Sequence, residues 1–64
     1  MKIDRLVSII LILLEQERIG AYALAEQFGV SPRTIYRDID AINLAGIPVC
    51  STPGVNGGFE IMPQ

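Results

Sequence analysis

Two arginine side chains, Arg33 and Arg37, are the residues of this sequence best placed to do chemistry. They are four residues apart, so on a helix they would share one face. The stretch 31–37 contains both of them and no acidic residue, although the chain as a whole carries a net charge of -2. A guanidinium group can clamp a phosphate or donate two parallel hydrogen bonds to a guanine edge. The stretch therefore predicts a locally positive site for phosphates or bases.

The rest of the inventory excludes most catalytic and metal chemistry. The 64 residues include no histidine, the side chain best suited to proton transfer near neutral pH and to zinc. Cys50 is the single cysteine, so no internal disulfide can form, and we expect it to be a small buried residue in a reducing compartment. The acidic pairs Glu15/Glu17 and Asp38/Asp40 are spaced two apart and diverge on a helix. We expect no catalytic residue, no metal site and no cofactor, and hence no enzyme.

Glycine and proline divide the chain into three helical stretches and one hairpin. The first helix is predicted over residues 2–17, and a short extended segment over residues 18–22 follows it. A second helix over residues 23–28 should bury Leu24 and Phe28 and end at Gly29, which accepts the left-handed conformation. Two short strands, over residues 47–52 and 58–62, are joined by a loop over residues 53–57.

The third helix, over residues 32–45, has the clearest boundaries. Ser31 can cap its free amides, Pro32 occupies the first helical position, and Gly46 follows its last turn. Its core-facing stripe consists of Ile35, Ile39 and Ile42. At 100° per residue the opposite face carries Arg33, Tyr36, Arg37 and Asp40. The elements together predict one α+β domain over residues 1–64.

A resemblance to a known family is carried by two runs in the middle of the chain. They are Leu24-Ala25-Glu26-Gln27-Phe28-Gly29-Val30-Ser31 and Thr34-Ile35-Tyr36-Arg37-Asp38-Ile39. They resemble the winged helix-turn-helix domain of DeoR-type regulators, particularly the N-terminal domain of WYL-domain transcriptional regulators. The later runs Ala45-Gly46-Ile47-Pro48-Val49 and Gly57-Gly58-Phe59 resemble the turn into the wing and the glycine pair that closes it.

The resemblance implies a bacterial transcriptional regulator, located in the cytoplasm, whose third helix reads the major groove of duplex DNA. Residues 1–64 would form the N-terminal part of a longer protein. Carried over position by position, the resemblance assigns DNA contacts to Ser31, Pro32, Arg33, Thr34, Tyr36 and Arg37. In the wing, Thr52 and Asn56 offer polar side chains, and Asn56 is included among the contacts. Since residues 41–59 contain no charged side chain, we expect the contacts of the wing to be weak.

Structural alternatives remain open for several of these residues. Arg33 and Arg37 could be solvated or could pair with Asp38 or Asp40, Tyr36 could pack sideways, and Ser31 and Thr34 could serve as caps alone. For Asp38 itself, a pairing that orients an arginine or ties helix three to helix one through Arg5 is expected rather than a DNA contact.

The first helix carries more apolar surface than a three-helix core requires. Its core-facing stripe is predicted as Ile3, Leu6, Val7, Ile10, Leu13 and Leu14, which leaves Ile9, Leu11 and Ile12 off the stripe. A second protomer or a C-terminal sensing domain would cover that surface, or its side chains are ordinary exposed residues. A dimer would allow binding to two half-sites about 34 Å apart or a multiple of that. The run over residues 6–14 is too short to span a membrane, and the charges that follow it argue against a secretory signal.

A second function from a different class is compatible with the same residues. A winged-helix module could use helix one to dock a protein and never touch DNA. Net acidity and the uncharged wing favour this alternative. Loss of DNA affinity on removal of Arg33 and Arg37 would favour the DNA-binding reading.

Overall fold

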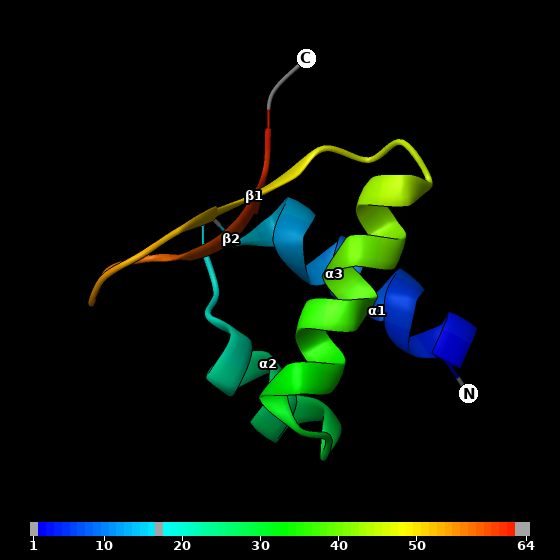
Figure 1. Ribbon diagram of the computed structural model, residues 1–64, viewed down its shortest axis with the longest axis horizontal. Helices are drawn as coiled ribbons and strands as arrows, with labels where there is room; N and C mark the ends of the chain where they lie inside the picture. Colours follow the sequence, from blue (N-terminus) through cyan, green and yellow to red (C-terminus); the bar gives the residue numbers. More distant parts are fainter. Residues whose placement is uncertain (1, 17, 63–64) are drawn as a thin grey trace.

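The computed structural model describes residues 2–16 and 18–62, which form three helices followed by a two-stranded antiparallel hairpin. The elements are α1 (Lys2–Glu15), α2 (Ala21–Phe28), α3 (Pro32–Leu44), β1 (Val49–Thr52) and β2 (Gly58–Ile61). In Figure 1 α3 crosses in front of α1, α2 lies beside the N-terminal half of α3, and the tip of the hairpin extends away from the helices. The α+β winged arrangement expected from the sequence is confirmed.

One apolar core joins all three helices and the hairpin. It contains side chains from every helix and one from β2, each less than one-tenth exposed: Ile9, Leu13, Ala21, Leu24, Ala25, Ile35, Ile39, Ile42 and Phe59. Full burial of a large aliphatic or aromatic side chain stabilises the folded state by about 1.5–3 kcal/mol. The three isoleucines predicted for the inner face of α3 are all in this core, so the face that α3 turns outward is fixed by packing.

The ends of α3 follow the sequence closely. The Ser31 hydroxyl accepts a hydrogen bond from the backbone N–H of Thr34 at 3.2 Å, and Pro32 is the first helical residue. Ala45 ends the helix and Gly46 follows with φ 98°, a conformation that favours glycine. Both boundary signals are therefore confirmed.

The second helix begins two residues earlier than predicted. Ala21, which lies in the segment predicted to be extended, is the first helical residue and is buried. The cap is Gly20, whose backbone is extended and which has no side chain to offer. Leu24 is fully buried as predicted, whereas Phe28 is half-buried against the edge of the core. Gly29, with φ 66°, ends the helix as expected.

The strands are shorter than the sequence suggested. Pairing runs from Val49↔Ile61 to Thr52↔Gly58, while the backbone N–H of Ile47 closes the end of α3 by donating to the Ile42 carbonyl. Residues 47 and 48 therefore lie outside β1, since Pro48 has no N–H and Ile47 is already bonded. Cys50, expected to be buried, is half-buried across from Glu60.

An isolated β-bridge attaches the segment between α1 and α2 to the hairpin. Ile19 and Phe59 exchange two backbone hydrogen bonds, of 2.8 and 3.3 Å. Gly58 lies so close to this segment that an added Cβ would stand 2.7 Å from the Ile19 carbonyl. Position 58 therefore requires glycine, because a side chain there would collide with the backbone of Ile19.

The first helix differs from the sequence in its length and in its rotation. It ends at Glu15, two residues before the predicted end, and residue 17 lies outside the described residues. The predicted inner stripe is only partly right: Leu13 is buried and Leu6 and Ile10 pack against the core, but Ile3, Val7 and Leu14 are exposed. Ile9, which the prediction left off the stripe, is fully buried. Because this helix is apolar nearly all round, its hydrophobic periodicity cannot select the buried face.

None of the helices in the described ranges combines the length and the apolar character that a bilayer span needs.

Candidate nucleic-acid interface

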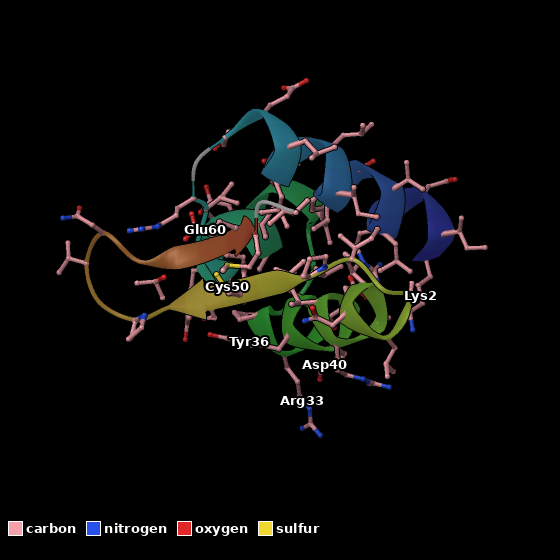
Figure 2. The ribbon with its side chains drawn as sticks, turned by 90° about the horizontal axis from the view of Figure 1, so that it is seen from above. Lys2, Arg33, Tyr36, Asp40, Cys50 and Glu60 are labelled. Atoms are coloured by element: carbon pink, nitrogen blue, oxygen red, sulfur yellow. The ribbon has the colours of Figure 1, made fainter. Side chains whose placement is uncertain are left out.

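The outer face of α3 presents two arginines with no protein partner. Arg33 and Arg37 are both exposed, and within residues 2–16 and 18–62 neither makes an ion pair or a hydrogen bond. Figure 2 shows Arg33 extending away from the body of the domain, on the side of α3 remote from α1. Pairing with Asp38 or Asp40, the structural alternative for these arginines, does not occur. Both guanidinium groups are free to meet an external anion.

The rotation of α3 is held by an ion pair on its opposite face. Asp38 is 1 % exposed and accepts two hydrogen bonds from Arg5 of α1, from Nε to Oδ2 at 2.5 Å and from Nη2 to Oδ1 at 3.1 Å. The hydrogen bond with Asp38 raises the pKa of Arg5, an effect that the nearby carboxylate charge reinforces and desolvation opposes. The predicted tie between helix three and helix one is confirmed, and it leaves Asp38 unavailable to a ligand.

The first turn of α3 combines a capped start with local positive charge. Ser31 is exposed. Its hydroxyl oxygen accepts a hydrogen bond from the Thr34 backbone N–H and also lies 3.2 Å from the Thr34 hydroxyl. The capping role considered for Ser31 is therefore confirmed, whereas Thr34 is the residue whose backbone N–H is capped. Pro32 is half-buried at the start of the helix. No acidic residue lies in this turn. A helix N-terminus favours anions, so the turn complements the two arginines.

Tyr36 belongs both to the exposed face and to the packing of the hairpin. Its ring meets that of Phe59 edge to face, with 5.5 Å between centroids and 78° between planes, yet half of the residue remains exposed. The sideways packing considered for this residue is confirmed. The exposed remainder of the side chain lies on the same helix face as the arginines, at the side where the hairpin begins.

Two substitutions at Tyr36 should separate its packing role from a contact with DNA. We expect Tyr36→Phe to leave the free energy of unfolding within about 0.5 kcal/mol of native, because the ring contact persists. Tyr36→Ala removes the contact between the two rings, which should lower the free energy of unfolding by about 0.5–1.5 kcal/mol in addition to the effect of the lost buried apolar area. If the hydroxyl contacts DNA, Tyr36→Phe should weaken duplex binding several-fold at constant stability. Urea unfolding measures the change in stability, and fluorescence anisotropy measures the DNA affinity. Equal DNA affinity for Tyr36→Phe and the native chain would show that the hydroxyl does not contact DNA.

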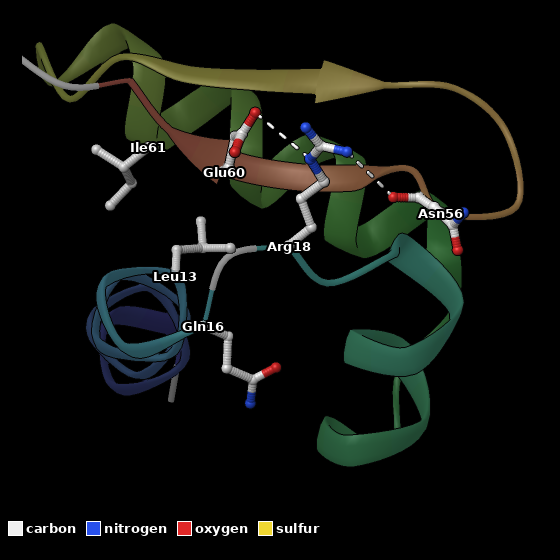
Figure 3. Close-up of a pocket in the computed structure, with 6 residues that line it drawn as sticks. All are labelled: Leu13, Gln16, Arg18, Asn56, Glu60 and Ile61. Carbon is white, nitrogen blue, oxygen red and sulfur yellow. Dashed lines mark hydrogen bonds and ion pairs between the residues drawn. The ribbon is translucent and has the colours of Figure 1, made fainter.

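The wing is fastened by an arginine that the sequence did not single out. Arg18 Nη1 donates to the backbone carbonyl of Asn56 at 3.3 Å, and its Nε lies 3.5 Å from Glu60 Oε1 (Figure 3). The Asn56 side chain is exposed near the tip of the wing, beside the fully exposed Val55. No local signal in the sequence points to this contact, because its partners are 38 and 42 residues away, one in the turn of the wing and the other in β2.

The Arg18 contacts border an open hollow of about 780 Å³ between α1 and β2. Its lining residues come from both elements and from the wing: Leu13, Gln16, Arg18, Asn56, Glu60 and Ile61. In Figure 2 Glu60 lies on the α1 side of the hairpin, whereas Tyr36 and Arg33 lie on the α3 side. The hollow is therefore not part of the arginine face, and its charged pair acts as a clamp for the wing.

The sequence that forms these helices and the hairpin has counterparts among known proteins. A family model described as an HTH domain matches residues 5–60 of the chain. The chain belongs to the helix-turn-helix (HTH) domain family. It is also 48% identical, over 62 residues, to the uncharacterized HTH-type transcriptional regulator YobV of Bacillus subtilis (strain 168). That alignment covers 97% of this chain and 20% of the relative. No solved structure matches the chain significantly.

Membership in this family assigns the domain to DNA binding rather than to an enzyme class. In an HTH pair the second helix enters the major groove, and here that helix is α3, which carries the free arginines. The chain spans about one fifth of the length of the relative, so the match concerns the HTH domain alone.

Proposed function

We propose that the HTH domain binds duplex DNA by placing the first two turns of α3 in the major groove. The observation that carries the proposal is the pair of exposed, unpaired guanidinium groups of Arg33 and Arg37 on the outward face of α3. Arginine at such positions donates to guanine edges or clamps phosphates. Ser31, Pro32, Thr34 and Tyr36 border the same face and would make the accompanying contacts.

The wing has a smaller part in this proposal. Thr52, Asn56 and the backbone amides of the turn are polar groups that it can offer to DNA, and residues 41–59 carry no charge. Arg18, the nearest cation, is engaged with Glu60 and with the Asn56 carbonyl. The wing would therefore position the domain on the duplex and add little electrostatic affinity.

For the whole protein we propose a bacterial transcriptional regulator that acts in the cytoplasm and in which this HTH domain is the N-terminal part. Support comes from the name and greater length of the B. subtilis relative. The sequence runs quoted for the DeoR-type and WYL-domain regulators support the finer assignment to that group. A C-terminal sensing domain would then confer the regulation.

Salt dependence of DNA affinity tests the proposed contact. With two or three phosphate-facing cations in each copy, the logarithm of the association constant should fall with the logarithm of salt concentration with a slope of about -2 to -3. Fluorescence anisotropy of a labelled duplex between about 25 and 200 mM salt measures that slope. An affinity that does not respond to salt, or no binding at the lowest salt, would contradict the proposal and favour the protein-docking alternative.

A further inference from the structure

Asp40 is an exposed carboxylate on the face of α3 that carries the two free arginines. At 100° per residue its direction is about 20° from that of Arg33 and about 60° from that of Arg37. Figure 2 shows Asp40 and Arg33 on the same side of α3, remote from α1. Asp40 makes no ion pair and no hydrogen bond with any residue that the structure describes. The outward face therefore carries one uncompensated negative charge beside two positive ones.

The packing of the described residues does not depend on Asp40. Asp38, two residues earlier, is buried and bonded to Arg5, whereas Asp40 lies at an exposed position in the interior of the helix. It caps neither end of α3, since Ser31 and Ala45 occupy those positions. Aspartate is also a poor helix former at an interior position. The carboxylate is therefore available to a partner outside the domain.

The distance between Asp40 and Arg33 along α3 is short enough for both to reach the same stretch of a duplex. Seven residues at 1.5 Å each separate the two by about 10.5 Å along the helix axis. Base pairs are stacked about 3.4 Å apart, so this distance corresponds to about three base-pair steps at most. With α3 lying along the major groove and Arg33 on a base, Asp40 lies within about three base pairs of that base.

A carboxylate in the major groove is selective because it accepts hydrogen bonds and repels other acceptors. Guanine presents N7 and O6 there, and thymine presents O4, all of which are acceptors. Adenine presents a donor at N6 beside the acceptor N7, whereas cytosine presents its N4 amino group without an acceptor of its own. The negatively charged phosphates also repel a carboxylate. Cytosine is therefore the base that Asp40 can contact at the lowest electrostatic cost.

We propose that Asp40 is a specificity-determining residue that accepts a hydrogen bond from the N4 amino group of a cytosine, an assignment that rests on the proposed function. This cytosine lies within about three base pairs of the base that Arg33 contacts. The carboxylate favours duplexes with cytosine at this position and weakens binding to duplexes that present an acceptor there. An Asp40 that is merely solvated would instead lower the affinity for every duplex alike.

Selection from a pool of duplexes with a randomised central stretch tests the role of Asp40. The native 64-residue chain should enrich a motif in which changing one cytosine weakens binding at least about fivefold in anisotropy titrations. Asp40→Ala should lose this preference, so that duplexes with any base at that position bind within about twofold of one another. Asp40→Asn should move the preference from cytosine to adenine, because an amide group donates to N7 and accepts from N6.

Glu15→Ala is the matched control, because it also removes one negative charge from an exposed helical residue, here at the end of α1 and away from the arginine face. It should enrich the native motif. The same motif for Asp40→Ala and the native chain, or an equal rise in the affinity of Asp40→Ala for all duplexes, would overturn the contact with cytosine. Binding to the pool without any enriched motif would also overturn it, yet would leave the proposed binding of duplex DNA intact. If the native chain binds no duplex at low salt, the proposed function and the role of Asp40 fail together.

Discussion

Replacing Arg33 and Arg37 by alanine should reduce the affinity for duplex DNA about 100-fold, with each single change costing about 10-fold, because each arginine that contacts a base is worth about 1–3 kcal/mol. If either arginine contacts a phosphate, its removal should also make the salt slope shallower by about one. Both side chains are exposed and unpaired within the described ranges, so the fold should be unaffected. Anisotropy titrations at fixed salt, with circular dichroism to confirm the fold, provide the measurement.

Lys2→Ala is the matched control for the single arginine variants. It removes the same one positive charge from an exposed position at the start of α1, away from the arginine face. If affinity depended on net charge alone, Lys2→Ala and Arg33→Ala would weaken binding equally. We expect Lys2→Ala to change the DNA affinity less than about twofold. If the double arginine variant kept the full native affinity, α3 would be excluded as the helix that reads DNA.

Replacing Asp38 by alanine should produce the largest loss of stability among single substitutions of charged residues. The carboxylate is buried and accepts both hydrogen bonds from Arg5, so its removal leaves the guanidinium without its partner and opens a gap between α1 and α3. We expect the midpoint of thermal unfolding to fall by roughly 10 °C or more, given about 4–8 °C for each kcal/mol in a domain of this size. Circular dichroism melts measure the shift.

Asp40→Ala supplies the control for this experiment, since it removes the same side chain two positions further along from an exposed site. It should shift the midpoint by no more than about 2 °C. Combining Arg5→Met with Asp38→Leu should recover most of the loss, because a buried ion pair can often be exchanged for an apolar pair of similar volume. Equal melting of Asp38→Ala and Asp40→Ala would show that the pair does not hold the two helices together.

Elements with strong local signals could be predicted from the sequence. For α3 this included the face of the helix that points outward. Ser31, Pro32 and Gly46 mark both ends of α3, and the spacing of its three isoleucines determines which way Arg33 and Arg37 point. The link between Arg5 and Asp38 was one of the pairings expected from the sequence, whereas the full burial of Asp38 was not predicted.

The rotation of α1 and the attachment of the wing could not be predicted in this way. Helix α1 is apolar on almost every side, so its buried face is chosen by tertiary contacts at Ile9 and by the position of Arg5 rather than by its own pattern. The contact of Arg18 with Asn56 and Glu60 joins residues distant in sequence, and it exists only once the hairpin has folded back toward α1. The early start of α2 reflects the burial of Ala21, a tertiary effect that outweighs the absence of a side-chain cap.

Phe59 connects three parts of the molecule: its backbone bridges to Ile19, its side chain is in the core, and its ring meets Tyr36 of α3. Arg18, in the segment between α1 and α2, adds a further attachment through the Asn56 carbonyl, so the wing is fastened to the helical part of the domain at more than one point. A wing held in this way has little freedom to move relative to α3 when the width of the DNA groove varies. Adjustment must then come from the duplex, so base steps that bend or compress easily would be favoured at positions that no side chain touches.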